Sequence, residues 1–585
     1  MIQKHLTASV LAQLALALAQ PAAHAAPAEF RFREEFLARL VEATPSLLEG
    51  QDPHTGRWGT GIWIVTDQHP IYPLAAVWAI RSENNPYYHD ERVLKAVMDG
   101  GDALIDDADD AGEWIFRKKD GSTWGKIYMP WTYSRWIRAF GLVREGMPPE
   151  RRSRWEKALL RGYAGISRSA LGKVHNIPTH HAMGLFHAGQ LFNREEWRAQ
   201  ARAFMAQVVA AQDPAGFWSE HHGPVVAYNF VYSDALGTYY AMSRDESVLP
   251  ALARAARFHA LMTYPDGSPV ETVDERNPYH PRIAAGNVGF SLTPEGRGYL
   301  ARQLALVAAK RRTAFTADDL ASFVLYGEEG PSVATAAEER DRSFLLEGGQ
   351  ALIRRKAPWY VCLSAYHCPV PENRWIQDRQ NLVSVFHDRV GLILGGGNTK
   401  LQPLWSTFTV GDPALLRHRP GDANPRFTPP PGIVHVPSAA TIRREDPVGL
   451  RLQYGPEQCE IDVEVVDSHR VRLHLRATAR SAQPVAAHLT FLPRLGTALR
   501  TERGFERKLD AEAFALGTGE VGAWLEHAGW RAWLPAGAAV RWPVLPHNPY
   551  RKDGAATPDE GRLVVTLPFS AEKSEQQVEI TVGAP

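Results

Sequence analysis

The periodicity of apolar residues changes near the middle of this 585-residue chain. From Phe30 to about Lys310 apolar residues recur at helical spacing, as they do in residues 151–170. Beyond Phe344 short runs rich in β-branched and aromatic residues follow one another, and residues 471–476 alternate with a period of two. The sequence therefore predicts a helical domain followed by an all-β domain.

Loops rich in proline, glycine and aromatic residues separate the expected helices, for example at residues 51–61 and 264–281. Helix pairs joined by long loops are typical of an α/α toroid, an incomplete barrel of helices. No repeat of fixed period is evident, so this prediction depends on the alternation alone. The predicted boundaries are a toroid at 26–312, a linker at 313–343 and an antiparallel β-sandwich at 344–585.

The composition is that of an ordinary globular protein, with 44% hydrophobic and 22% charged residues. The formal net charge is zero, which argues against a nucleic-acid-binding protein because such proteins usually carry a basic excess. An anionic substrate remains compatible with this balance, because a local basic cleft is sufficient to bind one. We expect a monomer.

The N-terminus has the pattern of a signal peptide. A weakly positive start at Lys4 precedes an apolar run at residues 6–19, and residues 23–25 (Ala-His-Ala) supply small side chains for cleavage. The run is too short to cross a bilayer, and no later segment is long and apolar enough to do so. We therefore expect residues 1–25 to be removed and the mature protein to be exported, to the periplasm or out of the cell.

The chain has three cysteines, Cys362, Cys368 and Cys459. Three are too few for a disulfide scaffold. Whether two of them form a disulfide is left open by the sequence.

Asn176 is the first candidate for chemistry. It lies in the motif His-Asn-Ile-Pro-Thr-His-His at residues 175–181. A side-chain amide can bind a carboxylate and stabilise a developing enolate-like charge. The alternative is a helix N-cap with Pro178 in the first turn, and this alternative is at least as well supported by the sequence.

Histidine is the second candidate type. His222 is the preferred residue, with His221, His180 and His181 as rivals, because imidazole titrates near neutral pH and can act as a base. Any one of them can instead be a hydrogen-bonded structural residue. Neither motif has the spacing of a familiar zinc signature, so we expect no metal or other cofactor at this site, and a structural divalent metal is left open.

Tyrosine and arginine complete the set. Tyr232, with Tyr228 as runner-up, can donate a proton to a glycosidic oxygen, although both also fall at spacings typical of helix packing. Arg276 can bind a carboxylate in a bidentate manner. The alternative for Arg276 is a salt bridge to Asp274 or Glu275 in its own loop.

In their order along the chain these residues resemble the α/α-toroid polysaccharide lyases. That group contains the hyaluronate, chondroitin AC and xanthan lyases and their heparinase II/III-like and alginate-lyase relatives. Its members carry a catalytic Asn near the start of a helix, a later segment with His and Tyr, and an Arg further on. The resemblance implies that Asn176, His222, Tyr232 and Arg276 are catalytic and converge in one groove.

The resemblance also implies an activity. The substrate would be an anionic, uronic-acid-containing polysaccharide, cleaved by β-elimination to leave unsaturated uronyl ends. Asn176 and Arg276 would bind the C6 carboxylate, His222 would be the base and Tyr232 the acid. If the C5 proton and the leaving oxygen lie on the same side of the ring, Tyr232 would do both jobs.

The motifs depart from the family pattern in two places, and the β region lacks a clear match to the His-rich start of the heparinase-type sandwich. His222 lies ten residues before Tyr232, one more than the pattern has, so His221 remains its rival. Ile177 and Pro178 stand where the family has an aromatic pair after the Asn. These departures concern the subfamily and the substrate more than the fold.

Further side chains are expected to bind the polysaccharide, by stacking on sugar rings or by polar contacts. They are Trp58, Trp63, Trp124, Trp218, His181, Tyr228, Asn277 and Arg135. Packing between helices is the alternative for several of the tryptophans. In the β domain, the polar and aromatic side chains of residues 367–378 belong either to the cleft or to a solvated loop.

Two other functions are compatible with the sequence. An α/α-barrel glycoside hydrolase acting on uronyl oligosaccharides needs two carboxyl groups at a defined separation. The candidate carboxyl groups for it are Asp213, Glu220, Asp266, Glu271 and Asp274. A non-catalytic carbohydrate-binding protein would keep the aromatic residues but would not need Asn, His, Tyr and Arg together.

Overall fold

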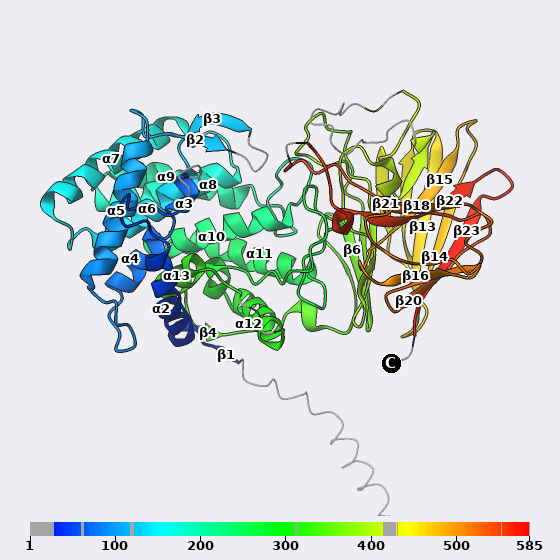
Figure 1. Ribbon diagram of the computed structural model, residues 1–585, viewed down its shortest axis with the longest axis horizontal. Coiled ribbons are helices and arrows are strands. Elements are labelled where there is room, and N and C mark those ends of the chain that lie inside the picture. Colours follow the sequence, from blue (N-terminus) through cyan, green and yellow to red (C-terminus); the bar gives the residue numbers. More distant parts are fainter. Residues whose placement is uncertain are drawn as a thin grey trace, which may run out of the picture.

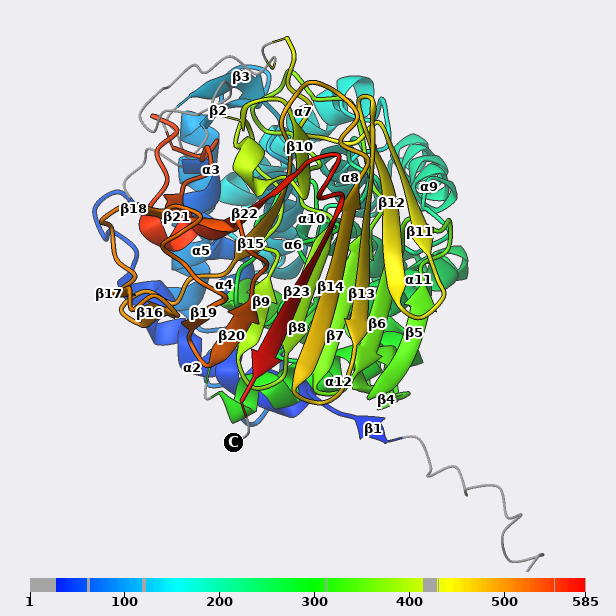
Figure 2. The same cartoon turned by 90° about the vertical axis from the view of Figure 1, so that its right-hand side faces the viewer.

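The computed structural model describes residues 28–59, 64–117, 122–310, 312, 314–413, 429, 431–551 and 553–583. A helical domain lies beside a β domain in Figure 1, and in Figure 2 the β domain lies in front of the helices. This confirms the predicted order of helices and then strands. The predicted signal peptide lies outside the described residues. Of the helices in the described residues, none has both the length and the apolar character needed to cross a membrane.

The helical domain is built from helices of four to 21 residues. They are α2 (Arg33–Glu49), α3 (Ile64–Asp67), α4 (Ile71–Ala79), α5 (Glu91–Asp107), α6 (Pro130–Val143), α7 (Pro149–Ser169), α8 (Asn176–Leu191), α9 (Glu195–Ala210), α10 (Val226–Ser243), α11 (Leu249–Leu261), α12 (Pro294–Ala309) and α13 (Ala317–Tyr326).

Five of these helices form an inner ring. Each of α4, α6, α8 and α10 contacts the next, and α13 closes the ring by contacting both α10 and α4. The other layer packs outside, with α5 on α4, α9 on α8, α11 on α10 and α2 on α13. This arrangement is an α/α toroid. The inner helix α4 is buried from Ile71 to Trp78, as expected for a helix that is apolar all round.

The first sheet of the β domain is antiparallel and faces the helices. Its strands are β5 (Asp341–Leu345), β6 (Ala351–Lys356), β7 (Trp359–Ser364), β8 (Val383–His387), β9 (Gly391–Leu394), β10 (Phe408–Val410), β15 (Val485–Phe491), β18 (Phe514–Leu516), β21 (Ala539–Val544) and β22 (Arg562–Phe569). Their order is β18-β21-β22-β15-β9-β8-β7-β6-β5, and β10 pairs with β15.

The second sheet packs on the first and completes a sandwich. Its strands are β11 (Ala439–Arg443), β12 (Val448–Tyr454), β13 (Glu457–Val465), β14 (Arg470–Ala477), β16 (Ala498–Thr501), β17 (Glu506–Lys508), β19 (Trp524–His527), β20 (Trp530–Trp533) and β23 (Glu575–Val582). Strand β14 shows why the sandwich forms, because Val471, Leu473 and Leu475 are buried and alternate with less buried polar residues.

The segment predicted as a linker, residues 313–343, has secondary structure of its own. It contains α13, whose apolar face closes the helical ring, and the first strand of the sandwich begins inside it at Asp341. Two small sheets also pair distant or neighbouring segments: β1 (Glu29–Phe30) with β4 (Gly330–Pro331), and β2 (Trp114–Arg117) with β3 (Thr123–Ile127).

The three cysteines are buried and free.

The loop after α11 joins the two domains through a buried polar network. The hydroxyl of Tyr264 donates to Glu271 Oε2 at 2.9 Å and lies 2.8 Å from Ser384 Oγ of the sandwich. The N–H of Gly396 donates to Glu271 Oε1 at 2.9 Å, and Arg562 Nη2 donates to the carbonyl of Gly396 at 2.7 Å. Buried polar groups in such a network must keep their partners, so the two domains have a defined relative position.

Replacing Gly396 with Ala should weaken this junction. The residue has a φ of +107°, and a Cβ there would lie 2.1 Å from Arg562 Nε. Backbone strain and overpacking together should lower the free energy of unfolding by roughly 2–5 kcal/mol. Gly391→Ala is the matched control, because its φ is +83° and a Cβ there meets nothing within 4 Å. The control should lose roughly 1–2 kcal/mol. Urea unfolding of both variants measures the difference, and equal losses would contradict the prediction.

Candidate active site

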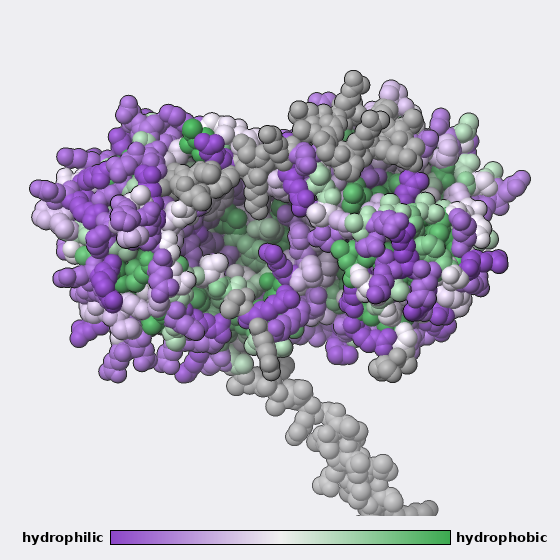
Figure 3. All heavy atoms as spheres, in the orientation of Figure 1, coloured by the Kyte–Doolittle hydropathy of each residue, from purple (hydrophilic) through white to green (hydrophobic). Residues whose placement is uncertain are grey.

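The candidate site lies at one end of the helical ring, where the toroid meets the sandwich. Three segments of the toroid supply it: the start of α8, the loop of residues 219–224 with the first turns of α10, and the loop after α11. The space-filling view shows that the molecule is hollowed on the side of the helical domain that faces the sandwich (Figure 3).

Glu220 is the centre of the first cluster. Its carboxylate is fully buried and accepts hydrogen bonds from Asn176 Nδ2 at 3.0 Å and from the hydroxyl of Tyr232 at 3.0 Å. His175 Nε2 lies 2.8 Å from the oxygen that Asn176 also contacts. One carboxylate therefore connects the start of α8 to α10.

Asn176 does not cap its own helix. His175 occupies the N-cap position with an extended backbone, and no side-chain cap bond is formed there. The amide of Asn176 is directed instead to Glu220. The N-cap interpretation that the sequence left open is therefore not supported.

Glu275 is the centre of a second cluster and is 1% exposed at its side chain. Oε1 lies 2.9 Å from His221 Nδ1, and Oε2 accepts the backbone N–H of His222 at 2.8 Å. The guanidinium of Arg379, which comes from the sandwich, lies 3.6 Å from Oε2. Burial alone would raise the pKa of Glu275, but the hydrogen bond from His221, the charge of Arg379 and the N–H of His222 outweigh it, so the pKa is lowered.

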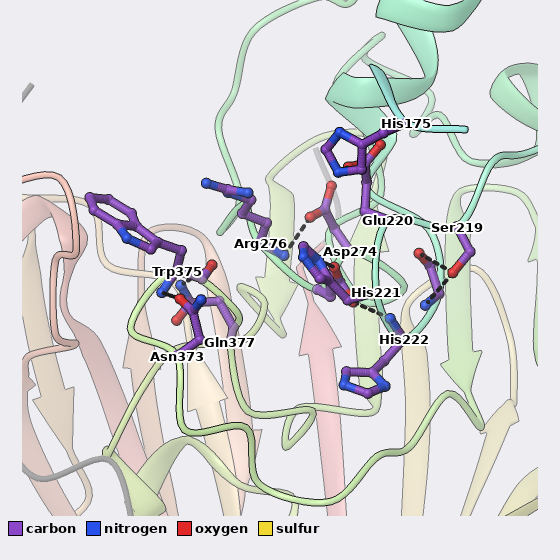
Figure 4. Close-up of polar contacts among 12 residues, drawn as sticks. His175, Ser219, Glu220, His221, His222, Asp274, Arg276, Asn373, Trp375 and Gln377 are labelled. Atoms are coloured by element: carbon purple, nitrogen blue, oxygen red, sulfur yellow. Dashed lines mark hydrogen bonds and ion pairs between the residues drawn. The ribbon is translucent and has the colours of Figure 1, made fainter. Parts of the chain in front are cut away.

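The two adjacent histidines are placed differently. The ring of His221 is held by Glu275 through Nδ1, and Nε2 of this ring has no hydrogen-bond partner among the described residues. The imidazole of His222 is exposed and points away from Glu220 and His221 (Figure 4). Only the backbone of His222 enters the cluster, so the geometry favours His221 over the predicted His222.

Arg276 is positioned by Asp274. The backbone N–H groups of Arg276 and Asn277 donate to Asp274 Oδ1 at 2.8 Å each, and Oδ2 accepts the N–H of Val226 at the start of α10, also at 2.8 Å. The guanidinium lies 5.1 Å from the centre of the Tyr228 ring. In the part of the chain that the structure describes, no carboxylate lies within ion-pair distance of Arg276.

The two candidate tyrosines differ in their surroundings. Tyr232 is buried and stacks on Trp218 at 4.9 Å, and burial followed by the charge of Glu220 raises its pKa strongly. Tyr228 is half-buried, and its hydroxyl makes no hydrogen bond with the described residues. Burial raises the pKa of Tyr228 to about 12, although the charge of Arg276 acts in the opposite direction. Both phenols are therefore protonated at neutral pH.

The sandwich contributes the opposite wall. Arg276 Nε donates to the hydroxyl of Tyr550 at 3.1 Å, and the Tyr550 ring lies 5.4 Å from that of Trp375. Figure 4 shows the guanidinium of Arg276 extending between Trp375 and the His175–Glu220 pair. A cavity of about 890 Å³ follows the junction of the domains and is lined by Arg276, Asn277 and Tyr550, among others. The loop of residues 367–378 thus reaches the cleft.

Several predicted substrate-binding residues are not available to a ligand. Trp58 is 5% exposed and its indole N–H donates to the carbonyl of Leu47 at 2.7 Å. Trp218 is buried behind Tyr232. His181 is buried, which lowers its pKa to about 4. Arg135 pairs with Asp318 of α13. These side chains hold helices together, which was the alternative for the tryptophans.

The remaining predicted contacts have three different outcomes. Asn277 lines the interdomain cavity. Trp124 is 53% exposed on the β2–β3 hairpin and packs against Phe116. Trp63 lies outside the described residues.

Sequence reasoning missed three members of the site. His175 was part of the recognised motif but was not singled out as a candidate. Glu275 was considered only as a partner for Arg276, whereas it pairs with His221 and Arg379. The contact of Tyr550 with Arg276 could not be predicted from any local pattern, because the two residues are 274 positions apart in the sequence. Across the described residues, no group of three or more His, Cys, Asp or Glu side chains is arranged to hold a metal ion.

Comparisons with known proteins give a limited picture. No family model and no curated protein matches this chain. Solved structures that it resembles include a heparinase III (11% identity, 98% of this chain and 88% of that chain, TM-score 0.48). They also include heparan sulfate lyase HepC from Pedobacter heparinus (12%, 94% and 83%, 0.46) and the chondroitin lyase ODV-E66, a baculovirus envelope protein (9%, 95% and 84%, 0.47). Such values do not establish a family, so the function proposed below is argued from the cleft.

The lowered pKa of Glu275 predicts a specific pH dependence of stability. Ionised Glu275 stabilises the fold at pH values above its ordinary pKa of about 4.5, and this contribution is lost as the pH falls from there through the lower folded-state value. Glu275→Gln leaves Arg379 buried without its partner charge and should cost roughly 3–5 kcal/mol at pH 7. The difference from the wild type should shrink as the pH falls below about 4.5.

Chemical denaturation of both proteins between pH 7 and pH 3 tests this prediction. Glu506→Gln is the control, because Glu506 pairs with Arg500 on the exposed surface and its loss should not be measurable. A constant difference between the wild type and Glu275→Gln at all pH values would show that the charge of Glu275 has no role in stability.

Proposed function

We propose that this protein is a lyase that cleaves a uronic-acid-containing polysaccharide by β-elimination. The observation that carries the proposal is the arrangement around Arg276. The guanidinium of Arg276 has no carboxylate partner among the described residues and lies over the ring of Tyr228. It is also close to the loop of His221, whose imidazole is oriented by a carboxylate. These are the groups needed to neutralise a uronate, remove its C5 proton and protonate the leaving oxygen.

Arg276 is the proposed carboxylate-binding group. A guanidinium binds a carboxylate with two parallel hydrogen bonds. Neutralising the C6 carboxylate acidifies the C5 proton, because the negative charge that develops on removing this proton spreads onto the carboxylate oxygens. Asn176, which Glu220 holds at the start of α8, can donate its second amide hydrogen to the same group.

His221 is the proposed base. Glu275 accepts the hydrogen on Nδ1, which leaves the lone pair of the neutral ring on Nε2. A buried carboxylate that orients an imidazole in this way is a common arrangement for a catalytic base. The C5 proton passes to His221 Nε2, the C4–O bond breaks, and a C4–C5 double bond forms.

Tyr228 is the proposed acid. Its pKa of about 12 keeps it protonated at neutral pH, and its hydroxyl is not used by the described residues. It can therefore give its proton to the departing glycosidic oxygen. Tyr232 is a positioning residue in this scheme, because its hydroxyl is occupied by Glu220. The proton taken up by His221 returns to Tyr228 through solvent before the next turnover.

A glycoside hydrolase is less well supported by the same geometry. Hydrolysis requires two carboxyl groups that face the scissile bond. The side chains of Glu220, Glu271 and Asp274 are buried, and each accepts several hydrogen bonds. Asp213 and Asp266 accept hydrogen bonds within their own turns, from Ala215 and from Ser268.

Export of the mature protein is part of the proposal. The N-terminal pattern of residues 1–25 supports it, since an apolar run of this length followed by Ala-His-Ala is typical of a signal peptide. Expression with the native N-terminus and mass spectrometry of the mature protein test it. A mature chain that begins near Ala26 and is found outside the cytoplasm is the expected result.

The activity is tested by the ultraviolet absorbance of the unsaturated uronyl product. The purified protein is incubated with hyaluronan, chondroitin, heparan sulfate, alginate, glucuronan and xanthan-type polymers. Absorbance should rise with at least one of them. Release of reducing ends without absorbance would indicate a hydrolase, and binding without either change would indicate a non-catalytic protein.

Substitution of the two adjacent histidines separates the proposed base from its neighbour. His221→Gln should lower kcat by about two orders of magnitude or more, because the base is lost. His222→Gln is the matched control and should keep near-normal turnover, because only its backbone enters the cluster. The reverse result in steady-state kinetics would return the role of base to His222.

Substitution of the two tyrosines separates the acid from the positioning residue. Tyr228→Phe should lower kcat by about two orders of magnitude and leave the thermal midpoint unchanged, because its hydroxyl makes no hydrogen bond with the described residues. Tyr232→Phe removes a donor from buried Glu220, so it should destabilise the protein by about 1–3 kcal/mol. Lost turnover in Tyr232→Phe together with normal turnover in Tyr228→Phe would make Tyr232 the acid.

A further inference from the structure

Gln377 is an unusual residue of the interdomain cavity. It is 2% exposed and lines the cavity, and its side-chain carbonyl Oε1 is buried and has no hydrogen-bond partner in the part of the chain that the structure describes. Its backbone N–H donates to the carbonyl of Glu275 at 3.1 Å, so the residue is fixed beside the residue that orients His221. A buried acceptor without a donor costs stability, and a ligand that supplies a donor explains why such a group is tolerated.

The surroundings of Gln377 are aromatic. Its amide nitrogen donates to the carbonyl of Trp375 at 3.5 Å, and the Trp375 ring lies 5.4 Å from the Tyr550 ring. Asn373 fixes this turn by accepting the N–H of Trp375 at 2.8 Å. Tyr550 in turn contacts Arg276. The carbonyl, the two rings and the guanidinium therefore belong to one continuous wall, most of which Figure 4 shows.

We propose that this wall is a subsite for a neutral, hydroxyl-bearing sugar that neighbours the uronate in the substrate. This inference rests on the function proposed above. The apolar face of a sugar ring packs on Trp375 and Tyr550, and one of its hydroxyl groups donates to Gln377 Oε1. The polymer that fits is an alternating one, in which each uronate at Arg276 is followed by a hexose or a hexosamine.

The chemistry of Gln377 also sets a preference. A carbonyl oxygen accepts a hydrogen bond from a hydroxyl group, whereas a sulfate ester or a carboxylate brings only acceptors at neutral pH. An acceptor placed against a buried acceptor is unfavourable, because neither group is paired. The subsite therefore selects against sugars that place a sulfate ester or a carboxylate opposite Gln377 Oε1.

Gln377→Met tests the subsite at the cost of one long hydrogen bond, from the Gln377 amide to the carbonyl of Trp375 at 3.5 Å. Methionine has nearly the same shape, the acceptor that it replaces has no partner among the described residues, and the lost amide hydrogen bond is long, so the thermal midpoint should change little. KM for the polymer that the wild type cleaves should rise by about three- to tenfold, and kcat should stay within about twofold. Gln303→Met is the matched control, because the amide of Gln303 donates to the carbonyls of Gly267 and Ala284. The control should lower the midpoint by several degrees.

Trp375→Ala tests the aromatic part of the wall. KM should rise about tenfold or more, since a stacking surface is lost while the reacting groups remain. Trp533→Ala is the control, because Trp533 is 40% exposed on β20 and, like Trp375, has an arginine near its ring. Its kinetics should match those of the wild type.

The substrate preference is measured with hyaluronan, unsulfated chondroitin and heparosan as alternating unsulfated polymers. Chondroitin sulfate and heparan sulfate are their sulfated counterparts, and alginate and glucuronan are pure polyuronates. The wild type should have its highest kcat/KM with an unsulfated alternating polymer. Gln377→Met should lower the ratio of kcat/KM for this polymer to kcat/KM for its sulfated counterpart.

The possible outcomes are distinct. A wild-type protein that cleaves none of these polymers overturns the proposed function and the subsite with it. A wild-type protein that cleaves only polyuronates leaves the lyase in place and overturns the subsite. The subsite is also overturned if Gln377→Met lowers the midpoint as much as Gln303→Met does, or if Gln377→Met and Trp375→Ala both keep the wild-type KM.

Discussion

The buried carboxylate of Glu275 is the interaction on which the candidate site depends. It contacts the imidazole of His221 and the backbone of His222 in one loop of the toroid, and the guanidinium of Arg379 in the sandwich. An ionised group at this depth is tolerated only when it is paired and hydrogen-bonded, because desolvation is costly. The loop of residues 219–224, the loop after α11 that carries Glu275, and the sandwich must therefore adopt their observed positions together. These positions direct His221 into the cleft.

The same requirement explains how a chain of zero net charge can present a cationic cleft. The side-chain carboxylates near the site are buried and interact with internal partners. Glu220 contacts His175, Asn176 and Tyr232, and Asp274 accepts hydrogen bonds from backbone N–H groups. Arg276 is left with only the neutral hydroxyl of Tyr550 as a side-chain hydrogen-bond partner in the described part of the chain. The surface offered to a polyanion is thus positive locally, although the molecule as a whole is neutral.

Periodicity was a good guide to elements and a poor guide to the exact site. The order of helices and strands followed from local pattern. The role of α13, which lies in the segment predicted as a linker, could not be predicted, because closing the ring depends on its contacts with α4 and α10. The choice between His221 and His222 depends on a loop in which Gly223 has a φ of +138°, which no spacing rule encodes. Trp58 and Trp218 were predicted to lie in the cleft because loop residues are usually exposed, whereas both fill the helical core.

The contribution of the sandwich is more than support for the toroid. Asp274 of the helical domain accepts the backbone N–H of Arg276, and Tyr550 of the β domain accepts a hydrogen bond from its guanidinium. The two contacts therefore fix different parts of the residue. Without the sandwich, Glu275 would lose Arg379 and Arg276 would lose Tyr550, so both the proposed base and the proposed anion-binding group would lose a contact that orients them. The helical ring supplies the reacting groups, and only the junction of the two domains orients them toward one substrate.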